Sequence, residues 1–166
     1  MMNGKALVMI LLLAIAMALP AQNFFEQNSR YINVEVDRTP IVSGGMFLQD
    51  MLALEVGAGL ASDGNSDTQG LMLQMGLDKY WGQGKLSTYV GGKTRFDINP
   101  VAFGNTGWKG SQLHLMGHWG VNYFILKQFS LAFDVGGELL LNSPKDRDSY
   151  SNFATFTSGI KFRFFF

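Results

Sequence analysis

Apolar and polar residues alternate along most of the chain after residue 50. In the segment 129–141, for example, Leu131 and Phe133 have one parity, whereas Asp134 and Glu138 have the other. A period of two predicts β-strands with one apolar and one polar face. The segments with this pattern are 51–61, 70–81, 85–97, 111–124, 129–141 and 151–166. Each is long enough to cross a bilayer when tilted, which takes about 9–11 residues.

The charged residues of these six segments share the face that carries glycine and small polar residues. They are Glu55, Asp78, Lys85, Lys93, Arg95, Asp97, Asp134, Glu138, Lys161 and Arg163. Only Lys79 has the apolar parity, next to a turn where its long side chain can reach water. If the strands close into a barrel with the apolar face outward, we expect all of these ten except Lys85 to form a charge network in the lumen.

The end of the chain is apolar and aromatic. Its last three residues are phenylalanines, and Phe162, Phe164 and Phe166 have the parity opposite to that of the nearby basic residues. The pattern Thr157-x-Gly159-x-x-Phe162-x-Phe164, followed by a terminal Phe166, resembles the assembly signal of outer-membrane β-barrels. The resemblance implies that the barrel-assembly machinery reads this last strand, which then closes the sheet against the first.

Two segments, 45–60 and 122–137, repeat one hairpin pattern. Each has a strand that ends in an aromatic residue, a short polar turn, and a strand reading LALEVG or LAFDVG. This pattern resembles the hairpins of small outer-membrane barrels of the OmpA/OmpX type, over residues 39–166. The resemblance implies an all-β fold, an eight-stranded antiparallel up-and-down transmembrane β-barrel, which would occupy residues 22–166.

Eight strands require two more before residue 51. The segment 31–47 alternates, with Ile32 and Val34 set against Asn33 and Glu35, and we interpret it as one long strand that projects past the membrane. Pro40 would lie at a bulge or an unpaired position. The segment 23–28 is then left for the first strand. Both termini should lie on the periplasmic side, so the count must be even, and eight is the nearest fit.

Residues 1–21 predict a signal peptide. Lys5 precedes an apolar run over residues 6–19, and Ala21 offers a cleavage site, with Ala18 as a second one. The run is shorter than the roughly 20 residues of a spanning helix, although an uncleaved anchor is the alternative. We therefore expect export, cleavage near Ala21 and residence in the outer membrane.

Composition narrows the possible chemistry. The chain has 13 basic and 13 acidic residues, so its net charge gives no reason to expect a nucleic-acid partner. It has no cysteine, which excludes disulfides and thiolate metal sites. No nucleotide motif or cluster of metal ligands stands out, and we expect neither a cofactor nor a metal.

The polarity of the side chains that face the interior distinguishes two classes of barrel, the soluble and the membrane-spanning. A secreted lipocalin-like barrel would hold its apolar face inside and is the alternative to a membrane barrel. The charged share of 16% lies below the roughly 25% of soluble domains, which favours the membrane barrel. Aromatic residues near strand ends resemble interfacial girdles: Phe47, Trp81, Phe96, Tyr123, Phe124, Phe129 and Phe153.

An eight-stranded barrel has an interior that side chains can fill, so we expect a plugged lumen rather than an open pore. The resemblance implies a structural or surface-interaction role, such as envelope integrity, adhesion or loop display. It also implies a monomer whose partners are outer-membrane lipid, lipopolysaccharide and the assembly machinery.

The alternative role is a lipid A-modifying enzyme on the same barrel. Its chemistry would need a base and a nucleophile, and His114, His118 and the nearby Ser111 are the candidates. We interpret both histidines as polar filler bonded to Asp97 or Asp134, and expect no enzymatic activity.

The final hairpin allows a prediction about one contact. We expect Asp134 to lie opposite Lys161 and to form an inward ion pair with it. The same register places Phe129 opposite Phe166. The alternative is a slipped register, in which Lys161 lies opposite Ala132 or Gly136 and pairs across the lumen with Glu55 or Asp78.

Overall fold

The computed structural model describes Phe25 and residues 27–36, 40–62, 69–82, 84–98, 110–145 and 148–166. The predicted signal peptide, residues 1–21, lies outside these ranges. Within them, no helix has the length and apolar character needed to cross a membrane.

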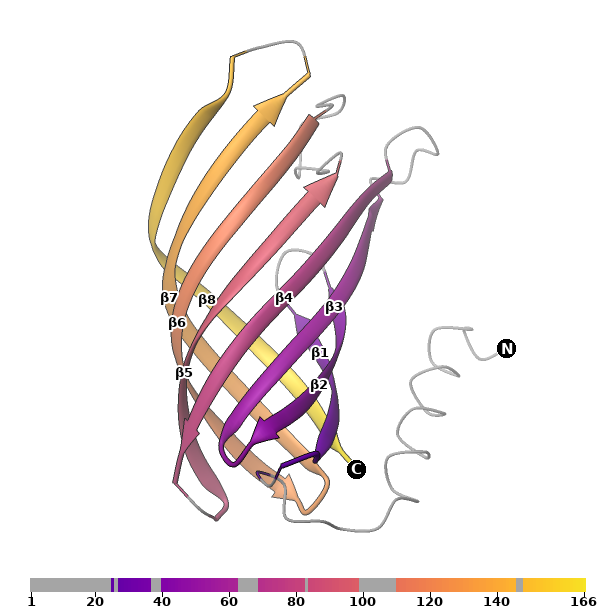
Figure 1. The fold of residues 1–166 in the computed structure, drawn as a ribbon, viewed down its shortest axis with the longest axis vertical. Helices are drawn as coiled ribbons and strands as arrows, with labels where there is room; N and C mark the ends of the chain where they lie inside the picture. Colours follow the sequence, from indigo (N-terminus) through magenta and orange to yellow (C-terminus); the bar gives the residue numbers. More distant parts are fainter. Residues whose placement is uncertain are drawn as a thin grey trace, which may run out of the picture.

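Eight strands form a closed barrel (Figure 1). They are β1 (Arg30–Val36), β2 (Ile41–Gln49), β3 (Leu52–Ser62), β4 (Gln69–Trp81), β5 (Leu86–Ile98), β6 (Gly110–Leu126), β7 (Phe129–Pro144) and β8 (Tyr150–Phe165). Each strand pairs antiparallel with its neighbours in the chain, and β8 pairs with β1. The predicted eight-stranded antiparallel up-and-down barrel is confirmed.

The interpretation of 31–47 as one strand is wrong. Val34 on β1 faces Val42 on β2, so the chain reverses between the two strands. The described residues of the segment 23–28, which are Phe25, Gln27 and Asn28, lie in turns rather than in the predicted first strand. Because Val34 and Val42 both have even numbers, their parity continues through the reversal, and alternation alone does not reveal it.

The two faces of the wall follow the alternation. On β4, Leu73 and Leu77 are exposed, whereas Gln74 and Asp78 are buried. The burial of polar residues on the inner face is complete at Arg163 on β8, whose side chain is 0% exposed. The barrel therefore has an apolar outer surface and a largely polar interior.

The wall has an uneven height. β1 and β2 have 7 and 9 residues, whereas β6, β7 and β8 have 17, 16 and 16. Figure 1 shows the long strands rising well above the β1–β2 hairpin. β1 pairs with β8 only between Val36–Ile160 and Tyr31–Phe165, so the upper part of β8 has β7 on one side and no described strand on the other.

The barrel has two distinct ends. The turn end carries the β2–β3, β4–β5 and β6–β7 turns together with the C-terminus, and the loop end carries the other four connections (Figure 1).

Candidate functional site

The lumen at the turn end is filled by aromatic side chains. Phe25, which precedes β1, enters this cluster from below, with ring centroids 5.2 Å from Tyr80 and 5.6 Å from Phe47 and Phe124. The buried members of the cluster are Tyr31, Phe47, Ala53, Tyr80, Tyr89, Phe124, Ala132 and Phe165. The barrel is therefore packed with rings across this end.

Two residues predicted for the outer aromatic girdle belong to this interior cluster instead. Phe47 shares the parity of the buried Ser43, and Phe124 shares that of the buried Asn122. The girdle prediction rests on nearness to strand ends, which does not determine the face on which a side chain lies, whereas parity does.

The other residues predicted for the girdle face outward. Trp81, Phe96, Tyr123 and Phe153 are exposed, and Phe129 packs against outward rings of β8.

Arg163 lies directly above the aromatic cluster. Its guanidinium carbon is 4.9 Å from the ring centroid of Tyr89 and 5.6 Å from those of Tyr31 and Tyr80. One amino group lies 3.4 Å from a carboxylate oxygen of Asp78. The rings and the carboxylate together compensate a cation that has no access to water.

Asp78 also binds His118, across an intervening strand. The Nε2 atom of His118 on β6 lies 2.8 Å from Oδ1 of Asp78 on β4. Between them on β5 is Gly91, which pairs with both residues. A Cβ atom at Gly91 would overlap the Asp78 carboxylate and lie 2.9 Å from Nε2 of His118. The glycine therefore makes this contact possible.

A second group of charges surrounds Asp134. Its Oδ2 atom lies 2.6 Å from Nζ of Lys161 and 3.7 Å from Nζ of Lys93. Lys93 in turn donates hydrogen bonds to both carboxylate oxygens of Glu35, at 2.8 and 3.0 Å. This chain of alternating charges joins β7, β8, β5 and β1 across the lumen.

The predicted Asp134–Lys161 ion pair is confirmed, but the predicted register is wrong. Lys161 lies opposite Ala132, and Asp134 lies opposite Gly159. The contact is therefore diagonal, and the opposing positions carry little or no side chain to obstruct it.

Glu55 is held by neutral donors. Asn33 and Ser43 donate hydrogen bonds to Oε1 at 3.0 and 2.8 Å, and the hydroxyl of Tyr31 donates to Oε2 at 3.2 Å. Gln74 also approaches Oε1, at 3.5 Å. Several hydrogen bonds to one carboxylate replace the water that it loses on burial.

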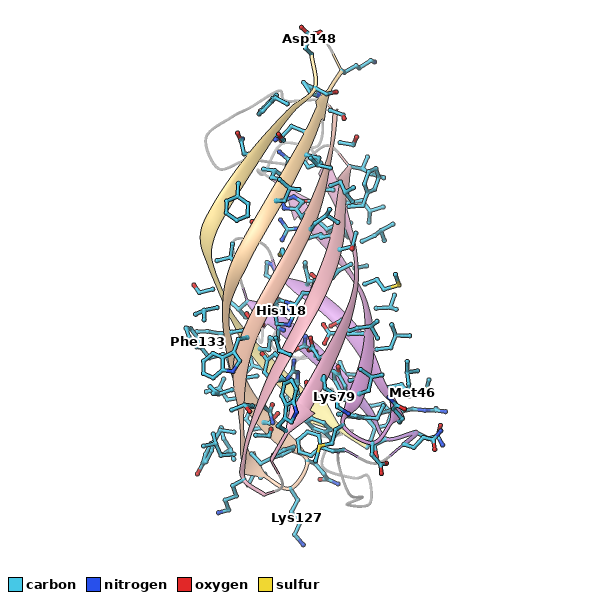
Figure 2. All side chains as sticks on the ribbon, turned by 60° about the vertical axis from the view of Figure 1, so that its left-hand side comes forward. Met46, Lys79, His118, Lys127, Phe133 and Asp148 are labelled. Carbon is cyan, nitrogen blue, oxygen red and sulfur yellow. The ribbon has the colours of Figure 1, made fainter. Side chains whose placement is uncertain are left out.

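A separate upper cluster lies towards the loop end. Arg95 Nε and Asp97 Oδ1 are 3.1 Å apart, and Nε2 of His114 lies 3.1 Å from Asp97 Oδ2. The other ring nitrogen of His114 contacts Glu138. The two histidines thus occupy different levels, and Figure 2 shows His118 near the middle of the barrel.

All nine residues predicted for the lumen network lie on the inner face of the barrel. Arg95, Asp97 and Glu138 belong to the upper cluster. The other six lie nearer the turn end, and we call them the deeper group: Glu55, Asp78, Lys93, Asp134, Lys161 and Arg163. Glu35 also belongs to the deeper group, although the prediction omitted it. The alternation of Glu35 with Ile32 and Val34 indicated its polar face. Its place in the barrel was not predictable from the interpretation of 31–47 as one long strand.

The residues of the predicted assembly signal occupy both faces of β8. Gly159 is buried on the inner face, Thr157 shares its parity, and Phe162 and Phe164 lie half-buried on the outer face. Phe166 exchanges two backbone hydrogen bonds with Arg30, which ties the chain end to β1. Recognition of this segment by assembly machinery stays a prediction.

The upper cluster gives little support to a serine-based reaction. Ser111 lies opposite Ile98 and Ser143 with the parity of the outer face, whereas His114 is buried on the inner face. Among the residues that the structure describes, no three His, Asp or Glu side chains are arranged to hold a metal ion.

Comparison with solved structures shows the fold. The N-terminal β-barrel domain of Pseudomonas aeruginosa OprF superposes with a TM-score of 0.53 and 20% identity, over 84% of this chain and 98% of that domain. A major outer membrane protein of Thermus thermophilus gives a TM-score of 0.40 and 10% identity, over 83% of this chain and 98% of that one. No family model and no curated protein matches the chain. The likeness to the OprF domain shows the fold of this chain, a closed eight-stranded antiparallel β-barrel of the kind found in outer-membrane proteins.

Proposed function

We propose that this protein is an integral outer-membrane barrel with a structural or surface-interaction role. The inversion of its surfaces carries the proposal: Lys161 and Arg163 are 0% exposed, while Leu60 and Phe153 are 77% and 69% exposed. Exposed apolar residues on all sides of a barrel are costly in water and favourable in lipid. A lipocalin-like soluble barrel would have the opposite arrangement.

The experiment that tests this proposal is fractionation of expressing cells followed by electrophoresis with and without boiling. We expect the folded protein in the outer-membrane fraction, migrating differently before boiling. Recovery as a soluble periplasmic protein would contradict the proposal.

The lumen is plugged in this proposal. The aromatic cluster blocks the turn end, and the paired charges above it fill the width that eight strands leave. Envelope integrity, adhesion or loop display are then the available roles, because they need no transport through the barrel. Planar-bilayer recordings of the purified protein should show no steady conductance, and reproducible channels at neutral pH would contradict the plug.

The protein acts without catalysis in this proposal. His114 is engaged by Asp97 and Glu138, and His118 by Asp78, which suits polar filling of the interior. Mass spectra of lipid A from cells with and without the protein should be identical. The proposed partners are outer-membrane lipid, lipopolysaccharide and, during biogenesis, the barrel-assembly machinery, and the proposed state is a monomer.

A further inference from the structure

Cations surround the turn end of the barrel. Arg30 begins β1, Lys79 lies beside the β2–β3 turn, Lys85 precedes β5, and Lys127 lies in the β6–β7 turn. Figure 2 shows Lys127 pointing away from the barrel at this end. We call these four residues the basic rim.

The basic rim lacks carboxylate partners among the described residues. Asp50 is the acidic residue near it in the part of the chain that the structure describes, and its carboxylate accepts a hydrogen bond from the backbone of Gln27 at 3.3 Å. Lys79 donates to the carbonyl oxygen of Asp50, at 3.2 Å, rather than to its carboxylate. Arg30, Lys85 and Lys127 are exposed.

The cations inside the barrel behave differently. Lys93, Lys161 and Arg163 each lie within 4 Å of a carboxylate oxygen, at 2.8, 2.6 and 3.4 Å. Each of these three interior cations therefore has a carboxylate partner, which none of the rim cations has within the described ranges.

Large apolar side chains adjoin the rim on the outer face. Lys85 is followed by Leu86, Lys127 is preceded by Leu126, and Lys79 lies two residues from Trp81. Leu86, Leu126 and Trp81 are all exposed. A cation next to an exposed apolar residue matches an amphiphile whose anionic group adjoins an apolar chain.

We propose that the basic rim binds anionic phospholipids, with the phosphodiester headgroups on the cations and the acyl chains on the apolar band. This inference rests on the proposed membrane function and adds a lipid preference at one end of the barrel. A soluble polyanion would use the cations but would leave the adjoining apolar residues unused.

Quenching of tryptophan by brominated lipids tests the proposal. Trp81 reports on the rim once Trp108→Phe and Trp119→Phe remove the other two tryptophans. The barrel is reconstituted in phosphatidylcholine vesicles that contain either brominated phosphatidylglycerol or brominated phosphatidylcholine at equal mole fraction. We expect the relative binding constant to favour phosphatidylglycerol by about fivefold or more, and the preference to fall as salt rises.

Two charge variants provide the comparison. The triple variant Lys79→Gln, Lys85→Gln, Lys127→Gln should lose the preference for phosphatidylglycerol. Lys145→Gln, which removes a cation from the loop end, should keep it.

Three outcomes would overturn the inference. Equal quenching by the two lipids in a properly inserted barrel would reject the basic rim while leaving the membrane function intact. Loss of the preference on adding glycerol phosphate at constant ionic strength would mean that the rim binds free phosphate esters. Failure to insert into either vesicle would reject the membrane function and the rim together.

Discussion

Lys161 on β8 and Asp134 on β7 form a buried ion pair although they are not opposite each other. Their charged atoms are 2.6 Å apart, while their opposing residues are Ala132 and Gly159. A Cβ atom at Gly159 would lie 2.9 Å from the Asp134 carboxylate, so the diagonal contact depends on that glycine.

This relationship predicts energetic coupling between Asp134 and Lys161. Asp134→Asn or Lys161→Met alone should each lower the free energy of unfolding by about 3–5 kcal/mol, because each removes the nearest opposite charge from a buried ion. The double variant should lose clearly less than the sum of the two. Urea unfolding in lipid vesicles measures all three.

The matched control combines Lys161→Met with Asp97→Asn, since Asp97 belongs to the upper cluster. Those two losses should be nearly additive. Additive losses for Asp134 and Lys161 as well would mean that the pair contributes no coupling.

Gly91 and Gly92 provide a matched pair of substitutions. Gly91→Ala should separate His118 from Asp78 and lower the free energy of unfolding by about 1–3 kcal/mol, because the new methyl group overpacks the lumen. Residue 92 faces outward, and the Cβ atom of Gly92→Ala would meet only the carbonyl oxygen of Met116, at an ordinary van der Waals distance of 3.6 Å. Its effect on unfolding should be close to zero, and a similar loss for both variants would contradict this account of Gly91.

The apolar outer surface predicts that an introduced arginine lowers the free energy of unfolding by an amount that depends on its depth in the membrane. Met75 lies midway along β4 and is 58% exposed, while Leu126 lies at the turn end and is 57% exposed. Met75→Arg should cost about 2–4 kcal/mol and Leu126→Arg about 0–1 kcal/mol, because only the first places a cation deep in hydrocarbon. Unfolding in vesicles measures both, and equal costs would argue against a membrane at this level of the wall.

We predict that the aromatic ring of Phe166 promotes assembly of the barrel in the outer membrane. Phe166→Ala keeps the backbone hydrogen bonds to Arg30 but removes the ring, and should reduce the amount of heat-modifiable barrel in the outer membrane. Phe153→Ala removes an exposed ring from the same strand and should assemble normally. Equal amounts of wild type and Phe166→Ala would reject the assembly-signal interpretation.

The sequence by itself determined the class of fold and the face of most residues. Side chains alternate with period two in any strand, so Asp78, Lys93 and Arg163 had to share a side with the glycines, wherever their partners lay. The six strands after residue 50 were predictable for the same reason.

Only the tertiary structure decided which residues meet. Parity is unchanged when a strand slips by two residues, so alternation could not distinguish Ala132 from Asp134 as the residue opposite Lys161. Val34 and Val42 also have the same parity, which hid the turn between β1 and β2.

The contacts inside the barrel also could not be predicted from the pattern of any single strand. His118 reaches Asp78 because a third strand places Gly91 between them, and Phe25 enters the barrel only because the closed wall surrounds it. Each of these contacts depends on how large and small side chains from different strands fit within one narrow lumen, and that fit exists only after the sheet has closed.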